Sequence, residues 1–85
     1  MSFSIRFVPI AGRQFNKIKE KKLKERVATA LEYIASDPLL GKALKAEFKG
    51  CYSLRFGDYR IIYNFSSVSK VVSVLRIDHR REVYR

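Results

Sequence analysis

Three arginines in the second half of the chain have the spacing of residues that share one face of a β-sheet. Arg55 and Arg60 flank the dipeptide Gly57-Asp58, between two stretches that alternate apolar and polar residues, and this pattern is typical of a tight hairpin. In that register Arg55 lies directly opposite Arg60, and such a like-charge pair is unfavourable unless an anion lies between the two side chains. Arg76, in the next predicted strand, is a candidate to join them. Because guanidinium groups donate paired hydrogen bonds to phosphate oxygens, the pattern predicts a phosphate-binding site.

A single-stranded RNA backbone is a natural occupant of such a site, and its own 2′-hydroxyl can act as the nucleophile in a cleavage reaction. That reaction needs a base for the hydroxyl proton, an acid for the leaving oxygen and positive charge on the phosphate. Arginine supplies only the charge, because it stays protonated in proteins. The candidates for proton transfer are His79, the one histidine of the chain, and Tyr84, since neighbouring cations favour the phenolate form of a tyrosine.

Each of these residues also has an ordinary structural interpretation. A lone histidine at a strand end is most often solvated or capping, and a terminal tyrosine usually packs on the edge of a core. The arginines could instead form surface ion pairs, which contribute little to stability. The acids available for such pairs are Asp58, Asp78 and Glu82. Basic residues outnumber them, so the anion site is the favoured interpretation.

Two further groups of cations are candidates for RNA binding. Beyond the last predicted strand, the basic tail contains Arg80, Arg81 and Arg85. In the predicted helical region, cations recur at helical spacing at Arg13, Lys17, Lys21 and Lys24. A run of this kind is usually a solvated helix face. The alternative is a track for nucleic-acid phosphates, whose binding weakens as salt is added.

The net charge independently indicates a polyanionic partner. The 18 Lys and Arg residues against 8 Asp and Glu residues give a formal charge of +10 on a chain of 9.9 kDa with a pI near 10.1. Nucleic acid is the commonest partner of such a protein, although an acidic protein or an anionic membrane would also satisfy the charge. The acidic residues are scattered singly and no glycine-rich phosphate loop is found, so neither a metal nor another cofactor is expected.

Cysteine usage and hydropathy point to the cytoplasm. Cys51 is the only cysteine, so an internal disulfide is impossible and a reducing compartment is expected. Residues 1–12 lack the basic start and long apolar run of a signal peptide, and no apolar stretch approaches the length needed to cross a membrane.

The hydrophobic periodicity predicts a single α+β domain over residues 1–85. Alternation predicts strands over residues 3–7, 52–56, 59–65 and 70–77, and a short strand start near Leu44. Helical spacing covers residues 11–35, with a break in the charged run at 19–22 and a stop at Ser36-Asp37-Pro38. In the hairpin register one face is wholly apolar or aromatic, and this face is expected to meet the helices.

The stretch Tyr52–Tyr63, followed by a Val-rich strand and by His79–Tyr84, resembles the C-terminal half of RelE/ParE toxins. The Lys-rich helical first half and the overall length agree, so the resemblance spans nearly the whole chain. It implies a β-α-α-β-β-β fold with two N-terminal helices packed on one face of an antiparallel-rich sheet.

The resemblance also implies roles for individual residues. Arg55, Arg60 and Arg80 match basic positions of the family, and Tyr84 matches its terminal tyrosine. Together with His79, these residues form the predicted catalytic group. Many members of the RelE branch carry a lysine where this chain has Ser53, so the identity of the proton acceptor stays open.

The activity implied by the RelE branch is metal-independent cleavage of messenger RNA on the ribosome, by the toxin of a type II toxin-antitoxin system. Its partners would be the ribosome, mRNA and a cognate antitoxin with an acidic, partly disordered segment. One alternative is a ParE-like toxin that inhibits DNA gyrase, and another is a basic RNA-binding module without catalysis. The tail with His79, Arg80 and Tyr84 favours the RNA chemistry, although the fold alone does not decide between these functions.

Overall fold

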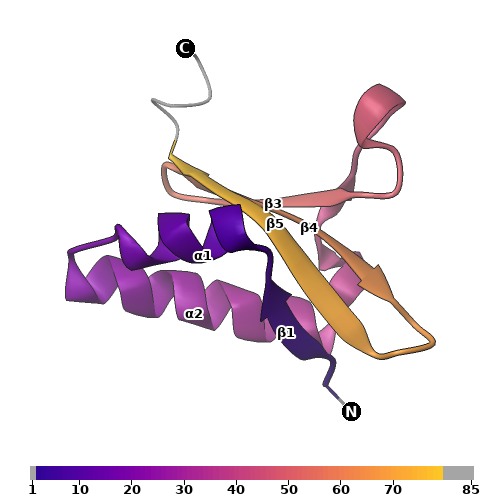
Figure 1. Ribbon diagram of the computed structural model, residues 1–85, viewed down its shortest axis with the longest axis horizontal. Coiled ribbons are helices and arrows are strands. Elements are labelled where there is room, and N and C mark those ends of the chain that lie inside the picture. Colours follow the sequence, from indigo (N-terminus) through magenta and orange to yellow (C-terminus); the bar gives the residue numbers. More distant parts are fainter. Residues whose placement is uncertain (1, 80–85) are drawn as a thin grey trace.

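The structure is a computed structural model that describes residues 2–79, with two helices layered on one face of a sheet (Figure 1). In chain order, the helices and strands are β1 (Ser4–Phe7), α1 (Pro9–Asn16), α2 (Lys21–Ser36), β2 (Lys42–Ala43), β3 (Tyr52–Phe56), β4 (Tyr59–Ser66) and β5 (Val71–His79). Two short 3-10 turns, η1 (Pro38–Leu40) and η2 (Ala46–Phe48), flank β2. The predicted α+β class and the two-layer arrangement are confirmed.

The sheet has five strands in the order β1-β5-β4-β3-β2. β1 runs parallel to β5, and the other three pairings are antiparallel. The short strand expected near Leu44 is found at Lys42–Ala43, where it pairs with the start of β3. β5 ends at His79, two positions beyond the predicted end at Ile77, because its pairing with β4 continues as far as Tyr59.

The helices bury an apolar stripe against the sheet. In α2 the buried residues Val27, Leu31 and Ile34 recur at the three- and four-residue spacing of one helix face. They pack on the buried sheet residues Ile61, Tyr63, Val72, Val74 and Ile77. The helical region breaks at residues 17–20, two positions earlier than predicted. Its predicted end at Ser36 is confirmed, and the Asp37 carboxylate accepts a hydrogen bond from the Leu39 amide at 3.2 Å.

The predicted hairpin register is confirmed at every position. Arg55 lies opposite Arg60, and the apolar or aromatic pairs are Phe56–Tyr59, Leu54–Ile61 and Tyr52–Tyr63. These apolar side chains contact the core under the helices, as predicted. Two-residue turns of the Gly57-Asp58 type fix the register in this way, because a slip by one residue would turn every side chain to the other face.

β5 carries one extra residue opposite β4. Leu75 has no partner of its own, because the register shifts between Ile62 and Tyr63. Such a β-bulge reverses the alternation of the side chains that follow it. Val74 and Ile77 are therefore both buried on the helix side, although they stand three positions apart.

Tyr63 anchors the loop that follows α2. Its hydroxyl donates a hydrogen bond to the Pro38 carbonyl at 2.7 Å and accepts one from the Gly41 amide at 2.9 Å. Burial raises the pKa of Tyr63 above its usual value of 10.0, so the hydroxyl remains protonated and able to donate.

Over the described residues, no helix has both the length and the apolar character needed to span a membrane.

Candidate nucleic-acid interface

The sheet face that points away from the helices, here called the outer face, carries most of the polar strand residues. In each strand these residues alternate with those that pack in the core, and the cross-strand register aligns them. The outer face includes Arg6, Lys42, Ser53, Arg55, Arg60, Ile62, Asn64, Ser73, Arg76 and Asp78. Within residues 2–79, five cations of the strands thus share this face with one acid.

Arg55 and Arg60 form the centre of the predicted phosphate site. They are direct partners across the β3–β4 pair; Arg55 is exposed and Arg60 is half-buried. Among residues 2–79, neither arginine has a carboxylate as an ion-pair partner. The structure therefore brings together two guanidinium groups whose mutual repulsion a bound phosphate would relieve.

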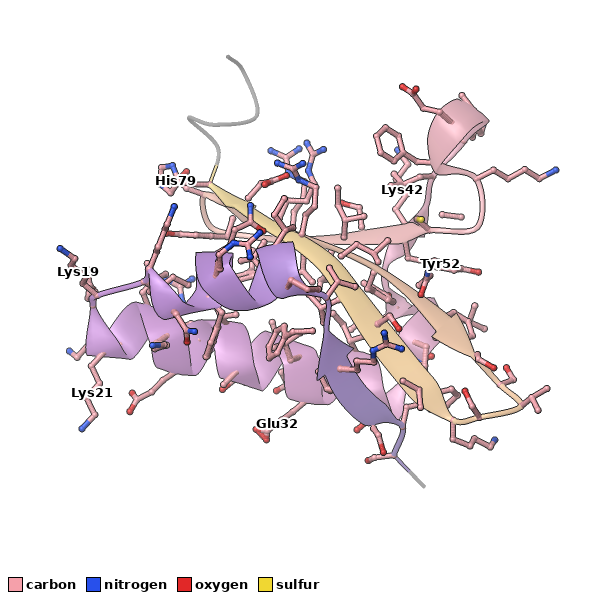
Figure 2. The ribbon with its side chains drawn as sticks, viewed as in Figure 1. Lys19, Lys21, Glu32, Lys42, Tyr52 and His79 are labelled. Carbon is pink, nitrogen blue, oxygen red and sulfur yellow. The ribbon has the colours of Figure 1, made fainter. Side chains whose placement is uncertain are left out.

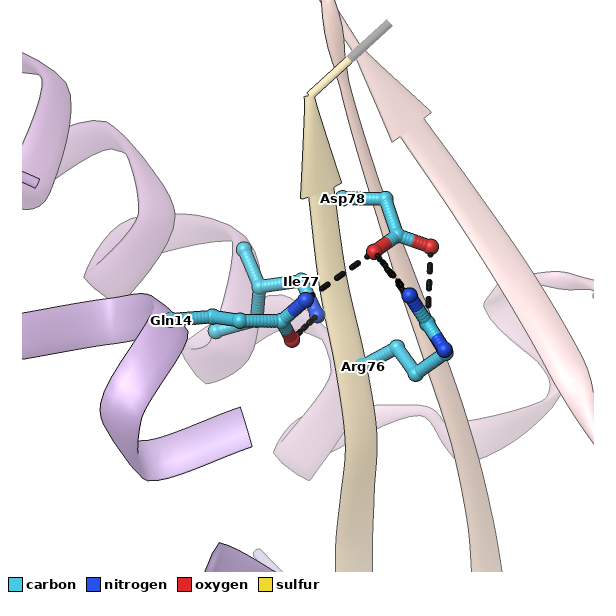
Figure 3. A network of polar contacts seen from close by, with 4 residues as sticks. All are labelled: Gln14, Arg76, Ile77 and Asp78. Atoms are coloured by element: carbon cyan, nitrogen blue, oxygen red, sulfur yellow. Dashed lines mark hydrogen bonds and ion pairs between the residues drawn. The ribbon is translucent and has the colours of Figure 1, made fainter. Parts of the chain in front are cut away.

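Arg76 lies on the same face, as expected, but a carboxylate holds it (Figure 3). Its Nε lies 3.0 Å from Oδ2 of Asp78, and its Nη2 donates to Oδ1 at 3.1 Å. Asp78 is only 7% exposed, whereas half of the Arg76 side chain remains accessible. The ion-pair interpretation thus holds for Arg76, while within residues 2–79 no carboxylate compensates the charges of Arg55 and Arg60.

Gln14 supports this ion pair from α1, a role that was not predicted from the sequence. β1 pairs with β5 only as far as Val74, which leaves the next part of the β5 edge to α1. The side-chain oxygen of Gln14 accepts a hydrogen bond from the Ile77 amide at 2.7 Å, and its Nε2 donates to Asp78 Oδ1 at 3.1 Å (Figure 3). A signal was available, because Gln14 follows the buried Ala11 of α1 by three positions, which places both on one helix face.

Replacing Gln14 with alanine should lower the free energy of unfolding by about 1–3 kcal/mol, because the Ile77 amide and Asp78 each lose a hydrogen-bond partner. Urea unfolding followed by circular dichroism would measure this change. Asn16→Ala is the matched control, since Asn16 is an exposed amide side chain on the same helix. Equal effects of the two substitutions would contradict the role given to Gln14.

His79 lies on the helix side of the sheet, away from Arg55 and Arg60. It pairs with Tyr59, and the two rings meet edge to face with centroids 4.9 Å apart. Both line a cavity of about 220 Å³ that also includes Gln14 and Lys17. Figure 2 shows His79 at the end of β5. The structure therefore does not bring His79 together with the arginine pair.

The helical lysines do not form one continuous track. Lys17 follows α1 and Lys21 begins α2, so the break between the helices interrupts the spacing on which that prediction rests. The Lys24 ammonium lies 5.0 Å from the centre of the Phe15 ring, where it ties α2 to α1. Figure 2 shows Lys21 at the end of the helical layer, pointing away from the sheet.

The remaining predicted site residues, Arg80, Arg81, Tyr84 and Arg85, lie outside the described residues. Within residues 2–79, no group of three or more His, Cys, Asp or Glu side chains lies close enough together to hold a metal ion. Apart from Asp78, which is paired with Arg76, the described part of the outer face offers positive charge and neutral hydrogen-bonding groups. This arrangement is suited to binding a phosphate and to stabilising charge that develops on it.

Comparisons with known proteins agree with this geometry. Residues 5–84 match the family described as the ParE toxin of type II toxin-antitoxin systems. Toxin RelG of Mycobacterium tuberculosis is 35% identical over 86 aligned positions, which cover 100% of this chain and 99% of RelG.

Solved structures extend the similarity to the fold. The RelBE2 toxin-antitoxin complex of M. tuberculosis contains a chain that matches with a TM-score of 0.83 and 33% identity, over 94% of this chain and 100% of that one. The isolated Escherichia coli RelE toxin has the same fold, with a TM-score of 0.79 at 21% identity over 98% of this chain and 92% of that one. The chain therefore belongs to the RelE/ParE superfamily of toxins of type II toxin-antitoxin systems.

Proposed function

We propose that this toxin is an endoribonuclease that cuts messenger RNA on the ribosome, without a metal, and so inhibits translation in the cytoplasm. The observation that carries the proposal is the Arg55–Arg60 pair on the outer face, which has no carboxylate partner among the described residues. Two adjacent guanidinium groups can hold the scissile phosphate and stabilise the charge that builds on it as the 2′-hydroxyl attacks.

The proposal divides the chemistry among the predicted catalytic residues. Arg55, Arg60 and Arg80 bind and stabilise the phosphate. Proton transfer is assigned to Tyr84, because the His79 ring lies on the opposite side of the sheet from the arginine pair. The basic tail residues Arg81 and Arg85 bind the flanking RNA.

A cognate antitoxin is the proposed inhibitor of this toxin. The similar M. tuberculosis chain is found in a toxin-antitoxin complex, and the charge of +10 suits an acidic partner. A groove of about 630 Å³ between α2 and β3 offers a place for an amphipathic segment, with Leu54 and Phe56 among its apolar lining and Arg26 and Arg55 among its cations. A segment bound there would contact one arginine of the phosphate site.

The test adds purified protein to a bacterial translation extract and maps the 5′ ends of a reporter mRNA by primer extension, with and without active ribosomes. We expect cuts only on translated message, at positions that reveal the codon preference. Cuts on free RNA would indicate a ribosome-independent nuclease. The absence of cuts in both samples would contradict the proposal.

Inhibition of DNA gyrase is the second candidate function, because the family that matches residues 5–84 is described as the ParE toxin of type II toxin-antitoxin systems. A supercoiling assay with purified gyrase distinguishes this candidate from mRNA cleavage. Inhibition of gyrase by the same protein preparation that leaves translated mRNA intact would favour this candidate.

A further inference from the structure

A second polar region lies on the outer face, near the turn between β4 and β5. It forms a basin of about 610 Å³, and its lining includes Arg6, Asn64, Ser66, Ser69 and Ser73. These residues come from three adjacent strands and the following turn. No carboxylate of residues 2–79 lines the basin, so the described residues give it a positive charge.

The strand register places the principal residues of this basin in one row. Arg6 of β1 lies opposite Ser73 of β5, and Ser73 lies opposite Asn64 of β4. Neighbouring strands are about 4.8 Å apart, so the row from Arg6 to Asn64 spans about 10 Å. One guanidinium group, one amide and one hydroxyl therefore point from the same line of the sheet.

The chemistry of this row matches the ribose–phosphate unit of a nucleic acid. Arg6 is exposed and, within residues 2–79, has no carboxylate as an ion-pair partner, so its fork of donors is available to phosphate oxygens. Asn64 and Ser73 are half-buried and can both donate and accept hydrogen bonds. A 2′-hydroxyl, which is a donor and an acceptor as well, fits such partners.

The basin lies on the same face as the arginine pair but at a distance from it. Asn64 and Arg60 stand four positions apart on β4, which corresponds to about 13 Å along the strand. An RNA chain whose phosphate lies between Arg55 and Arg60 must therefore contain further nucleotides to reach Arg6. The part of the face between the two ends includes the uncharged residues Ser53 and Ile62, and Arg76 lies opposite Ile62 on β5.

We propose that the row Arg6–Ser73–Asn64 is a second RNA subsite, which binds the ribose–phosphate backbone of a nucleotide remote from the cut. This subsite rests on the proposed function, because it assumes that the chain bound at Arg55 and Arg60 is single-stranded RNA. Because the subsite contacts only the ribose–phosphate backbone, it would bind the mRNA regardless of the base sequence.

The experiment measures how strongly added RNA length improves binding to the full chain. Fluorescence anisotropy is recorded with a short RNA, sufficient for the arginine pair alone, and with a longer RNA that can also reach Arg6. Three variants are compared with the wild type: Arg6→Ala, Asn64→Asp, and the control Lys19→Ala. Asn64→Asp adds a negative charge with almost no change in volume, and Lys19→Ala removes an exposed cation between the two helices (Figure 2).

The wild type and Lys19→Ala should bind the longer RNA more tightly than the short one. Arg6→Ala and Asn64→Asp should bind the short RNA normally and lose about five- to tenfold in affinity for the longer one. For Arg6→Ala, the dependence of the logarithm of affinity on the logarithm of salt concentration should also become shallower by about 0.7, as expected for one lost phosphate contact on a single strand. Thermal melts confirm that the variants fold.

The subsite is wrong if length adds nothing for the wild type, or if Arg6→Ala matches Lys19→Ala. It is equally wrong if binding of polyglutamate depends on Arg6 while binding of the longer RNA does not, since the basin would then serve an acidic protein. Failure of the proposed function would appear elsewhere, as absent cuts by the wild type in the translation extract.

Discussion

Replacing Arg60 with alanine is expected to reduce cleavage of translated message by about 10²- to 10³-fold and to abolish toxicity. The substitution removes a fixed positive charge that, in the proposed reaction, stabilises the negative charge developing on the phosphate. The fold should survive. Arg60 lies on the outer face opposite both Arg55 and Asp78, so one repulsive and one attractive neighbour are lost together. The melting temperature should therefore change little.

Primer extension in the translation extract gives the cleavage rate, and a thermal melt gives the stability. Arg60→Lys is the informative partner, since it keeps the charge and loses the planar fork, and it should fall between wild type and Arg60→Ala. Lys19→Ala, which removes an exposed charge far from the outer face, should cut like the wild type. Cleavage at the wild-type rate by Arg60→Ala would remove Arg60 from the site.

Replacing Gly41 with alanine is expected to lower the free energy of unfolding by about 2–4 kcal/mol, a large fraction of the 5–15 kcal/mol typical of small proteins. A Cβ atom at this position would lie 2.6 Å from the Tyr63 hydroxyl and 3.0 Å from the Ser53 carbonyl oxygen. Tyr63 is fully buried, so it cannot move aside without giving up its hydrogen bonds to Pro38 and Gly41.

Gly12→Ala provides a control of opposite sign. Gly12 lies inside α1, and the nearest atom to an added Cβ is that of Phe7 at 3.9 Å, an ordinary contact. Alanine is the better helix former there, so this substitution should raise stability by about 0.5–1 kcal/mol. Urea unfolding of both variants measures the contrast, and a Gly41→Ala protein as stable as the wild type would show that Tyr63 does not hold the loop tightly.

The parts of the fold that depend on local pattern were predictable from the sequence. The Gly57-Asp58 turn fixes the register of its hairpin, and that register alone predicts that Arg55 lies opposite Arg60, as it does. Alternation also indicated which face of the hairpin would be buried, because a period of two allows only one choice. The stop after Ser36 followed from the restriction that Pro38 imposes.

The bulge in β5 explains why other residues were harder to place. Strict alternation does not reveal that Leu75 is an extra residue, yet the faces of Arg76, Asp78 and His79 depend on it. His79 could be grouped with the arginines only while it was assigned to a tail rather than to a paired strand. Its true partner, Tyr59, lies on the helix side.

Long-range pairing accounts for the residues that were missed altogether. Arg6 was visible as the polar member of an alternating strand, but its neighbours Ser73 and Asn64 follow from the parallel pairing of β1 with β5. Likewise, Gln14 acquires its role only because β1 stops short and α1 covers the rest of the β5 edge. Gln14 has a local signal in its place on the inward face of α1, but its partners on β5, like the partners of Arg6, are not set by local sequence.

The order of strands in the sheet has a consequence for how the protein comes into being. β5 lies between β1 and β4 and pairs with both, yet it is the last of the five described strands in chain order. The pairing of Ser4 with Val71 joins residues that are 67 positions apart in the sequence, and contacts so distant in sequence form late and slowly. A nascent chain that lacks β5 cannot align Arg6 with Arg60 on one surface. The outer face can therefore be completed only after residues 71–79 have been synthesised.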